Sequence, residues 1–217
     1  MKEYCNGNSL HQKILEGVNI LADNVASTLG PRGRNVILQN KGRTPITTKD
    51  GVTVAKFIEL EDPIQNVGAQ ILKQASEQTN NEAGDGTTTS TVLARAILQQ
   101  SQKYITAGVS PIELKRGIDK AVKAIVKKLE EQAKPISNEE DIAHVAKISS
   151  NGDEQIGNLI AMAVDKAGKD GAITIEEARS IETSLDIVEG FIFDSGFLAT
   201  AFITDERKAA VFYENPL

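Results

Sequence analysis

Residues 81–90, with the sequence Asn-Glu-Ala-Gly-Asp-Gly-Thr-Thr-Thr-Ser, constrain the fold more than any other stretch of the chain. Two glycines bracket Asp85, four hydroxyl residues follow, and a helical pattern of apolar residues begins directly afterwards. Gly84 and Gly86 have no Cβ, so the backbone there can adopt left-handed angles and bring its N–H groups close to a charged ligand. Residues 87–89 open the next helix, where unpaired N–H groups and the helix dipole favour an anion. The stretch therefore predicts a phosphate-binding loop.

Asp85 carries a charge of the same sign as a phosphate, so its place in this loop needs an explanation. Mg²⁺ is commonly held by one or two carboxylates together with phosphate oxygens, and we therefore expect Asp85 to bind Mg²⁺. The loop is not of the Walker A type, because no Lys-Ser or Lys-Thr follows its second glycine. A plain turn followed by a helix cap also fits a Gly-Asp-Gly sequence, so the residues alone leave both interpretations open.

Composition restricts the class of protein and of partner. The 217 residues are 40% hydrophobic and 25% charged, which is typical of soluble globular proteins. A formal net charge of −6 offers no excess of positive charge for a nucleic-acid backbone, so we expect no nucleic-acid partner. Cys5 is the single cysteine, which excludes an intrachain disulfide and suits a reducing compartment. Without a secretory signal, a transit peptide or an apolar run of about 18 residues, we expect a protein that does not enter a membrane and is cytoplasmic of the bacterial type, with an organellar origin left open.

Periodicity predicts a first part that is mainly helical. Apolar residues recur every three or four positions from Leu10 to Leu29, and Gly30-Pro31 is a stop signal for that helix. Pro63 and Pro111 each follow a capping residue and begin another long apolar stripe. These patterns indicate long amphipathic helices that pack on one another.

Short extended segments are predicted between the first two long helices. Val, Ile and Leu at residues 36–38 indicate a strand. Lys49-Asp50-Gly51 is predicted to be a turn between extended residues 46–48 and extended residues 52–54. Taken alone, this turn carries no functional weight.

The character of the chain changes at Pro135. Two short helices with caps at residues 137–140 and at Asp153 are followed by a period close to two in residues 172–175 and 185–188, which predicts strands. Phenylalanines gather after residue 190, and either a core strand or an apolar surface for a partner explains them. The fold class expected is mainly α with a smaller α+β part, divided near residues 131–135.

Several motifs together resemble the group I chaperonins, the 60 kDa GroEL-type family. They are residues 28–36 (Thr-Leu-Gly-Pro-Arg-Gly-Arg-Asn-Val), 48–52 (Thr-Lys-Asp-Gly-Val), 59–62 (Glu-Leu-Glu-Asp), 83–89 (Ala-Gly-Asp-Gly-Thr-Thr-Thr), 114–121 (Leu-Lys-Arg-Gly-Ile-Asp-Lys-Ala) and 188–190 (Val-Glu-Gly). The resemblance covers essentially the whole chain, and the Gly-Arg-Asn-Val ending of the first motif favours group I over the archaeal and eukaryotic cytosolic group.

The resemblance implies a domain organisation. Residues 1–131 match the N-terminal half of the family's equatorial, ATP-binding domain, residues 132–188 an intermediate-domain segment, and residues 189–217 the start of the apical domain. Family members run to well over twice this length and complete the equatorial domain with their C-terminal part. The resemblance therefore implies an N-terminal portion of such a protein.

The resemblance also assigns roles to residues. It places Asp50 near the attacking water as the catalytic residue, Asp85 on Mg²⁺, and Gly86, Thr87, Thr88 and Thr89 on the phosphates of ATP. The rest of the nucleotide pocket is expected at Thr28, Leu29, Gly30, Pro31 and Lys49. A K⁺ site of the family draws on Thr28, Lys49 and Thr88.

The function implied is that of a chaperonin subunit that uses ATP binding and hydrolysis to assist the folding of non-native polypeptides. The partners implied are further copies in stacked heptameric rings, a co-chaperonin lid and unfolded polypeptides, which Phe197 and Phe202 are expected to contact. Ser195 and Ala201 depart from the arginine and tyrosine common in the family at these places. The alternatives are a non-enzymatic, chaperonin-like interaction protein without ATP turnover and an unrelated phosphotransferase with a Gly-Asp-Gly loop.

Overall fold

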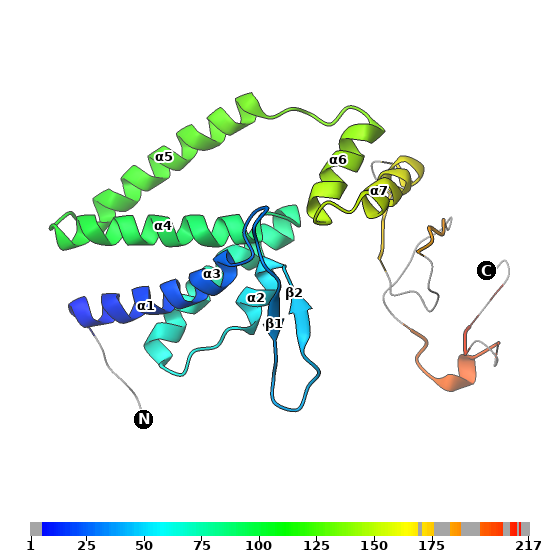
Figure 1. Ribbon diagram of the computed structural model, residues 1–217, viewed down its shortest axis with the longest axis horizontal. Helices are drawn as coiled ribbons and strands as arrows, with labels where there is room; N and C mark the ends of the chain where they lie inside the picture. Colours follow the sequence, from blue (N-terminus) through cyan, green and yellow to red (C-terminus); the bar gives the residue numbers. More distant parts are fainter. Residues whose placement is uncertain are drawn as a thin grey trace. The chain divides into compact units, whose positions relative to one another are not determined.

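The computed structural model describes residues 6–168, 171–175, 183–187, 196–205, 209–211 and 213. The chain divides into two compact units, Met1–Lys134 and Pro135–Leu217. The described residues are mostly helical with one small two-stranded sheet, which confirms the predicted fold class (Figure 1). The assignment of residues 1–131, 132–188 and 189–217 to the domains of a chaperonin stays a prediction. None of the described helices combines the length and the apolar character needed to cross a bilayer.

The first unit contains the long helices and the sheet. Its elements are α1 (Gly7–Ala26), β1 (Val36–Leu38), β2 (Ile46–Thr48), α2 (Gly51–Phe57), α3 (Pro63–Ala83), α4 (Thr87–Thr106) and α5 (Pro111–Gln132). Helices α1, α3 and α4 pack against one another, and short α2 contacts all three (Figure 1). The two strands pair antiparallel, with Ile37 opposite Thr47.

The core of this unit is made by three helices that each contribute small or branched apolar side chains. Its buried residues are Val18, Leu21, Ala22 and Val25 of α1, Val54 and Ala55 of α2, and Ala69 and Leu72 of α3. Ala94 and Leu98 of α4 pack against this cluster from one side. The apolar stripe predicted for the first helix is therefore the face that holds the unit together.

Two glycines let α1 and α3 approach closely. A Cβ on Gly17 would lie 1.8 Å from the carbonyl oxygen of Gln65, and a Cβ on Gly68 would lie 2.1 Å from that of Ile14. Neither distance is possible for a real side chain, so each helix presents a backbone surface to the other. The crossing is flanked by a Lys13 to Asp62 ion pair of 2.6 Å.

Two local predictions are wrong in this unit. Residues 52–54 are helical in α2 and not extended, because Asp50 caps a helix and three of the following apolar side chains are buried in the helical register. The first helix ends at Ala26 and does not reach Leu29. The N–H groups of Thr28 and Leu29 instead bond the carbonyl groups of Val25 and Ala26, which tightens the end of the helix into a turn.

Helix α5 has the apolar stripe that the sequence predicts, but none of its residues is buried. The exposed members of the stripe include Val122, Ile125 and Leu129. Its N-terminal proline stands where expected, although the Ser110 side chain makes no capping bond.

The second unit contains α6 (Glu139–Ser149), α7 (Glu154–Ala167) and a short 3-10 helix, Thr200–Phe202. The predicted caps are confirmed, since Asn138 accepts from the N–H of Asp141 and Asp153 from that of Ile156. Residues 172–175 and 185–187 form no strand, so that prediction is wrong for them. Residue 188 and residues 190–195 lie outside the described residues, and residues 196–198 are not in a strand.

The α1–α3 contact can be tested with one substitution. We expect Gly68→Ala to lower the free energy of unfolding by about 1–3 kcal/mol, because the added methyl group must push the two backbones apart. The control is Gly117→Ala in α5, where a Cβ meets no atom within 4 Å. There the gain in helix propensity should raise stability by about 0.5–1 kcal/mol. Chemical denaturation followed by circular dichroism measures both, and an equal response would contradict the contact.

The cap of α3 predicts a pH dependence. Bonds from the Lys13 ammonium and from the N–H groups of Gln65 and Ile64 hold the pKa of Asp62 below its ordinary value of 3.8. The ionised form is therefore favoured by folding, so its contribution is present above pH 3.8 and is lost as the pH falls through the lower folded-state pKa. We expect Asp62→Asn to lower the urea midpoint at pH 7, and the difference from the unchanged protein to shrink as the pH falls below 3.8. A difference that does not shrink below pH 3.8 would contradict this. Glu61→Gln controls for loss of one charge.

Candidate functional site

The loop between α3 and α4 has the backbone geometry that its two glycines permit. Gly84 ends α3 with φ 69° and Gly86 precedes α4 with φ 82°, both in the left-handed region. Between them, Asp85 accepts the N–H of Gly86 on Oδ1 at 2.6 Å. Other residues are strained at such angles, so the chain reverses here in a way that requires glycine.

The N-terminus of α4 presents backbone N–H groups without a side-chain cap. The same is true of α1 and α5, whereas α2, α3, α6 and α7 are each capped by an Asp or Asn side chain. The Thr87 side chain is buried, and its carbonyl group accepts the hydroxyls of Ser90 and Thr91. Thr88 is half-buried and Thr89 exposed. An uncapped first turn with neighbouring hydroxyls suits an anionic ligand.

Two other segments converge on Thr88. A Cβ on Gly51, the first residue of α2, would lie 2.2 Å from Thr88 Oγ1 and 3.0 Å from its backbone nitrogen. The buried Thr28, in the turn after α1, places its Oγ1 3.2 Å from Thr88 Oγ1. The start of α2, the end of α1 and the start of α4 therefore meet at one threonine, although they lie far apart in sequence.

The turn after α1 is folded tightly around Thr28. The hydroxyl of Thr28 donates to the carbonyl group of Val25 at 2.8 Å, and a Cβ on Gly33 would lie 2.1 Å from the carbonyl oxygen of Thr28. Gly30 is left-handed with φ 70°. Leu29, Gly30 and Pro31 are exposed beside this turn. The backbone is thus held in place while these three residues face outward.

Asp50 is a helix cap whose carboxylate is held on one oxygen. Its Oδ2 accepts the backbone N–H of Thr53 at 2.9 Å and the Thr53 hydroxyl at 2.5 Å. Its own N–H donates to Thr48 Oγ1 at 3.1 Å. Asp50 is exposed, and the half-buried Lys49 precedes it at the end of β2. The turn between two extended segments that the sequence predicts here is therefore a junction between a strand and a helix.

The structure brings together a subset of the residues expected from the sequence. Contacts link Thr28 to Thr88 and Gly51 to Thr87 and Thr88, and the chain itself joins Asp50 to Gly51 and Asp85 to the start of α4. Phe197 and Phe202 belong to the second unit, where both are exposed. Ser195 lies outside the described residues, and Ala201 lies in the 3-10 helix.

Comparison with known proteins decides the family. The sequence model that describes the TCP-1/cpn60 chaperonin family matches residues 21–215 of this chain. That range contains every residue of the arrangement around Thr88. The chain belongs to the TCP-1/cpn60 chaperonin family. The resemblance carried by the sequence motifs is confirmed at this level, while the assignment to group I stays a prediction.

A solved chaperonin has a similar fold. The crystal structure of the chaperonin gp146 from the bacteriophage EL 2 (Pseudomonas aeruginosa), in the presence of ATP-BeFx, matches this chain with a TM-score of 0.59 and 29% sequence identity. The match covers 72% of this chain and 28% of the phage chaperonin. This chaperonin chain therefore spans less than a third of the length of that relative.

The side chains around the loop between α3 and α4 can hold a cation such as Mg²⁺ only if a phosphate supplies further ligands. The described residues contain no group of three or more His, Cys, Asp or Glu side chains that could hold a metal ion unaided. Asp85 supplies one exposed carboxylate beside the hydroxyls and N–H groups of α4. Mg²⁺ accepts such sparse protein ligation when phosphate oxygens and waters complete its shell, so the residues fit a Mg²⁺ and nucleotide complex.

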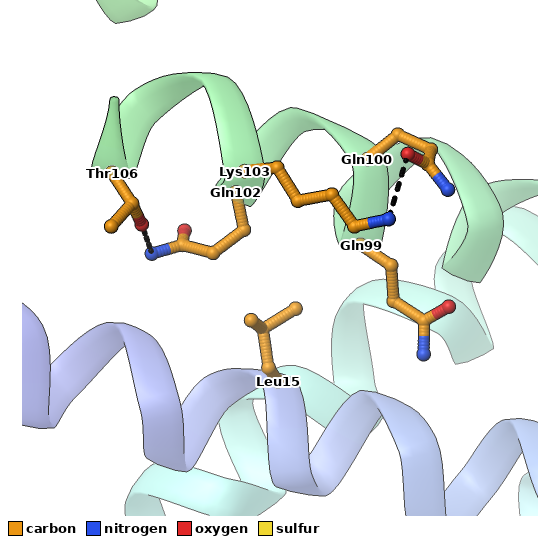
Figure 2. Close-up of a pocket in the computed structure, with 6 residues that line it drawn as sticks. All are labelled: Leu15, Gln99, Gln100, Gln102, Lys103 and Thr106. Atoms are coloured by element: carbon orange, nitrogen blue, oxygen red, sulfur yellow. Dashed lines mark hydrogen bonds between the residues drawn. The ribbon is translucent and has the colours of Figure 1, made fainter. Parts of the chain in front are cut away.

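A hollow elsewhere on this chaperonin chain is not the site. It has a volume of about 470 Å³ and lies between α1 and the C-terminal half of α4, lined by Leu15, Gln99, Gln100, Gln102, Lys103 and Thr106 (Figure 2). At about 1.5 Å per residue, Gln99 stands roughly 18 Å along the helix from its N-terminus. The uncapped helix start that suits a phosphate therefore lies at the N-terminus of α4, and the hollow lies beside its C-terminal half.

Sequence reasoning missed two residues of this site. The sequence predicts Gly51 only as part of a turn, because its approach to Thr88 exists only once the helices are packed. Thr53 has a signal in the sequence, since an Asp followed three residues later by a hydroxyl residue is the spacing of a helix cap and its first-turn partner.

The junction at Thr88 predicts a local response to substitution. Gly51→Ala places a methyl carbon 2.2 Å from Thr88 Oγ1 and 3.0 Å from the Thr88 backbone nitrogen, so the Thr88 side chain and the start of α4 must shift. We expect amide hydrogen exchange to accelerate by at least tenfold at Ser90 and Thr53. The α6 and α7 amides should be unchanged and serve as the internal control. Equal exchange at Ser90 in both proteins would show that the helices do not depend on this contact.

Proposed function

We propose that this chain is the nucleotide-binding N-terminal part of a group I chaperonin subunit, and that the phosphates of Mg-ATP bind at the N-terminus of α4. The observation that carries the proposal is the meeting of Thr28, Gly51 and Thr88 beside an uncapped helix start. Three segments packed so closely at a plain structural turn would be unexplained. Around a phosphate chain, each has a role as a donor or as a close backbone surface.

The chain's own residues would divide the work. The backbone N–H groups of Thr87, Thr88 and Thr89 would donate to the phosphates, because Gly86 before them provides no side-chain cap. The hydroxyls of Thr88 and Thr89 would add donors, and Gly86, which has no Cβ, would let the phosphates approach the backbone. Asp85 would hold Mg²⁺, and Mg²⁺ when bound neutralises phosphate charge. Thr28, Leu29, Gly30, Pro31 and Lys49 would line the rest of the nucleotide pocket, and the oxygens of Thr28, Lys49 and Thr88 would take part in a K⁺ site.

Asp50 is the residue we assign to hydrolysis. Phosphoryl transfer needs chiefly positioning and charge stabilisation, with a residue that orients the attacking water. Asp50 is exposed and directly precedes Gly51, where a Cβ would lie 2.2 Å from Thr88 Oγ1. It is therefore fixed next to the helix start where the terminal phosphate would lie.

The wider role proposed is that of a chaperonin. Family membership and the fold shared with a chaperonin crystallised with an ATP analogue support assistance of protein folding driven by ATP. Stacked heptameric rings, a co-chaperonin lid, unfolded polypeptides held near Phe197 and Phe202, and a cytoplasmic location belong to the same proposal.

Two substitutions separate binding from hydrolysis in the intact protein that carries this sequence. We expect Asp85→Asn to weaken Mg-ATP binding by at least tenfold in calorimetry, because one ligand of the cation is lost. Asp50→Asn should retain binding, since an amide oxygen still caps α2, and should lower turnover at least a hundredfold in a phosphate-release assay. The control is Asp165→Asn, which removes the same single negative charge at an exposed position on α7.

The unchanged protein decides between the candidate functions. A folded protein that takes up no Mg-ATP would overturn the assignment of the site. Uptake without turnover, together with a monomeric or small assembly in sedimentation, would favour a non-enzymatic chaperonin-like interaction protein. Normal turnover in Asp50→Asn would remove Asp50 from the reaction while leaving the binding site in place.

A further inference from the structure

Thr53 contacts Asp50 more extensively than a helix cap requires. Its backbone N–H and its hydroxyl both donate to the same carboxylate oxygen, at 2.9 Å and 2.5 Å. We propose that Thr53 is a positioning residue that fixes the plane of the Asp50 carboxylate so that Oδ1 is presented to the attacking water. This inference rests on the hydrolytic role proposed above for Asp50.

A purely structural explanation accounts for only half of the contact. A capping carboxylate needs a single backbone N–H from the second or third helical residue. At the other described side-chain caps, the capping oxygens of Asp62, Asn138 and Asp153 receive backbone N–H groups. Asp50 has that bond as well, and the Thr53 hydroxyl adds a second donor to the same oxygen. The helix start would be satisfied without the hydroxyl.

Because α2 is held by its neighbours, the hydrogen bond from the Thr53 hydroxyl restricts the orientation of the Asp50 carboxylate. At one end, Gly51 lies against Thr88, so the helix has no room to advance toward α4. At the other end, the buried Lys73 side chain of α3 donates to the carbonyl group of Lys56 at 3.3 Å. The backbone that carries Asp50 is therefore anchored at both ends. Loss of the Thr53 hydroxyl leaves the backbone N–H as the only Thr53 donor to Oδ2, so one of the two charge-assisted bonds that restrict rotation of the carboxylate is removed.

The test compares two variants in the intact protein that carries this sequence. Thr53→Val keeps the shape and removes the hydroxyl, and Thr53→Ser keeps the hydroxyl. We expect Thr53→Val to lower kcat for Mg-ATP about tenfold, which is a barrier increase of about 1.4 kcal/mol. The KM and the calorimetric Kd should change less than twofold. Thr53→Ser should retain the turnover of the unchanged protein, and Thr47→Val, on exposed β2, is the matched control.

Each outcome decides something different. Unchanged kcat in Thr53→Val, a raised KM with unchanged kcat, or an equal loss in Thr53→Ser would overturn the positioning role and leave the nucleotide site standing. An unchanged protein without turnover would overturn the hydrolytic function and this inference together. If Thr53→Val loses its helical circular dichroism, Thr53→Ala is measured against Thr53→Ser with the same criteria.

Discussion

The backbone-to-backbone approach of α1 and α3 is the constraint on which the packing of α2 and α4 depends. Gly17 and Gly68 leave no space for a side chain at the crossing, so the axes of the two helices are fixed by main-chain contact and not by adjustable side chains. Around that crossing, α2 adds Val54 and Ala55 to the core, and α4 rests Ala94 and Leu98 on it. The positions of the end of α1 and the start of α4 follow from this packing.

Helix α2 connects the core to the candidate site. It has seven residues, too few to be stable by itself, so its position depends on what it packs against. Its apolar side chains enter the core, Lys73 binds its last turn, and Gly51 limits its approach to Thr88. A short helix held in this way carries Asp50 with little freedom. Precision at the site thus follows from the packing of residues that never touch a ligand.

The sequence predicted features that depend on neighbouring residues and missed those that depend on distant ones. The glycines of the loop and the cap at Asp62 have local causes, and the structure shows both. An Asp-Gly pair is equally suited to a hairpin and to a helix start, and burial of Val52 and Val54 decided for the helix. Alternation in residues 172–175 predicted a strand, but alternation does not supply a partner strand. The approach of Gly51 to Thr88 joins segments more than thirty residues apart, so only the packed structure reveals it.

The charges around α4 explain why the proposed site would select a nucleotide that carries a cation. The expected phosphate donors are neutral N–H groups and hydroxyls, and the nearby side chains Asp50 and Asp85 are carboxylates. In a chain with a net charge of −6, a free polyphosphate meets repulsion from both carboxylates, and its attraction comes from dipoles and from the single charge of Lys49. A bound Mg²⁺ reverses this balance, because it attracts Asp85 and the phosphate oxygens at once. The dependence of nucleotide binding on Mg²⁺ then follows from all of these donors together. A lysine introduced into the loop would reduce that dependence, because its charge would attract the phosphates directly.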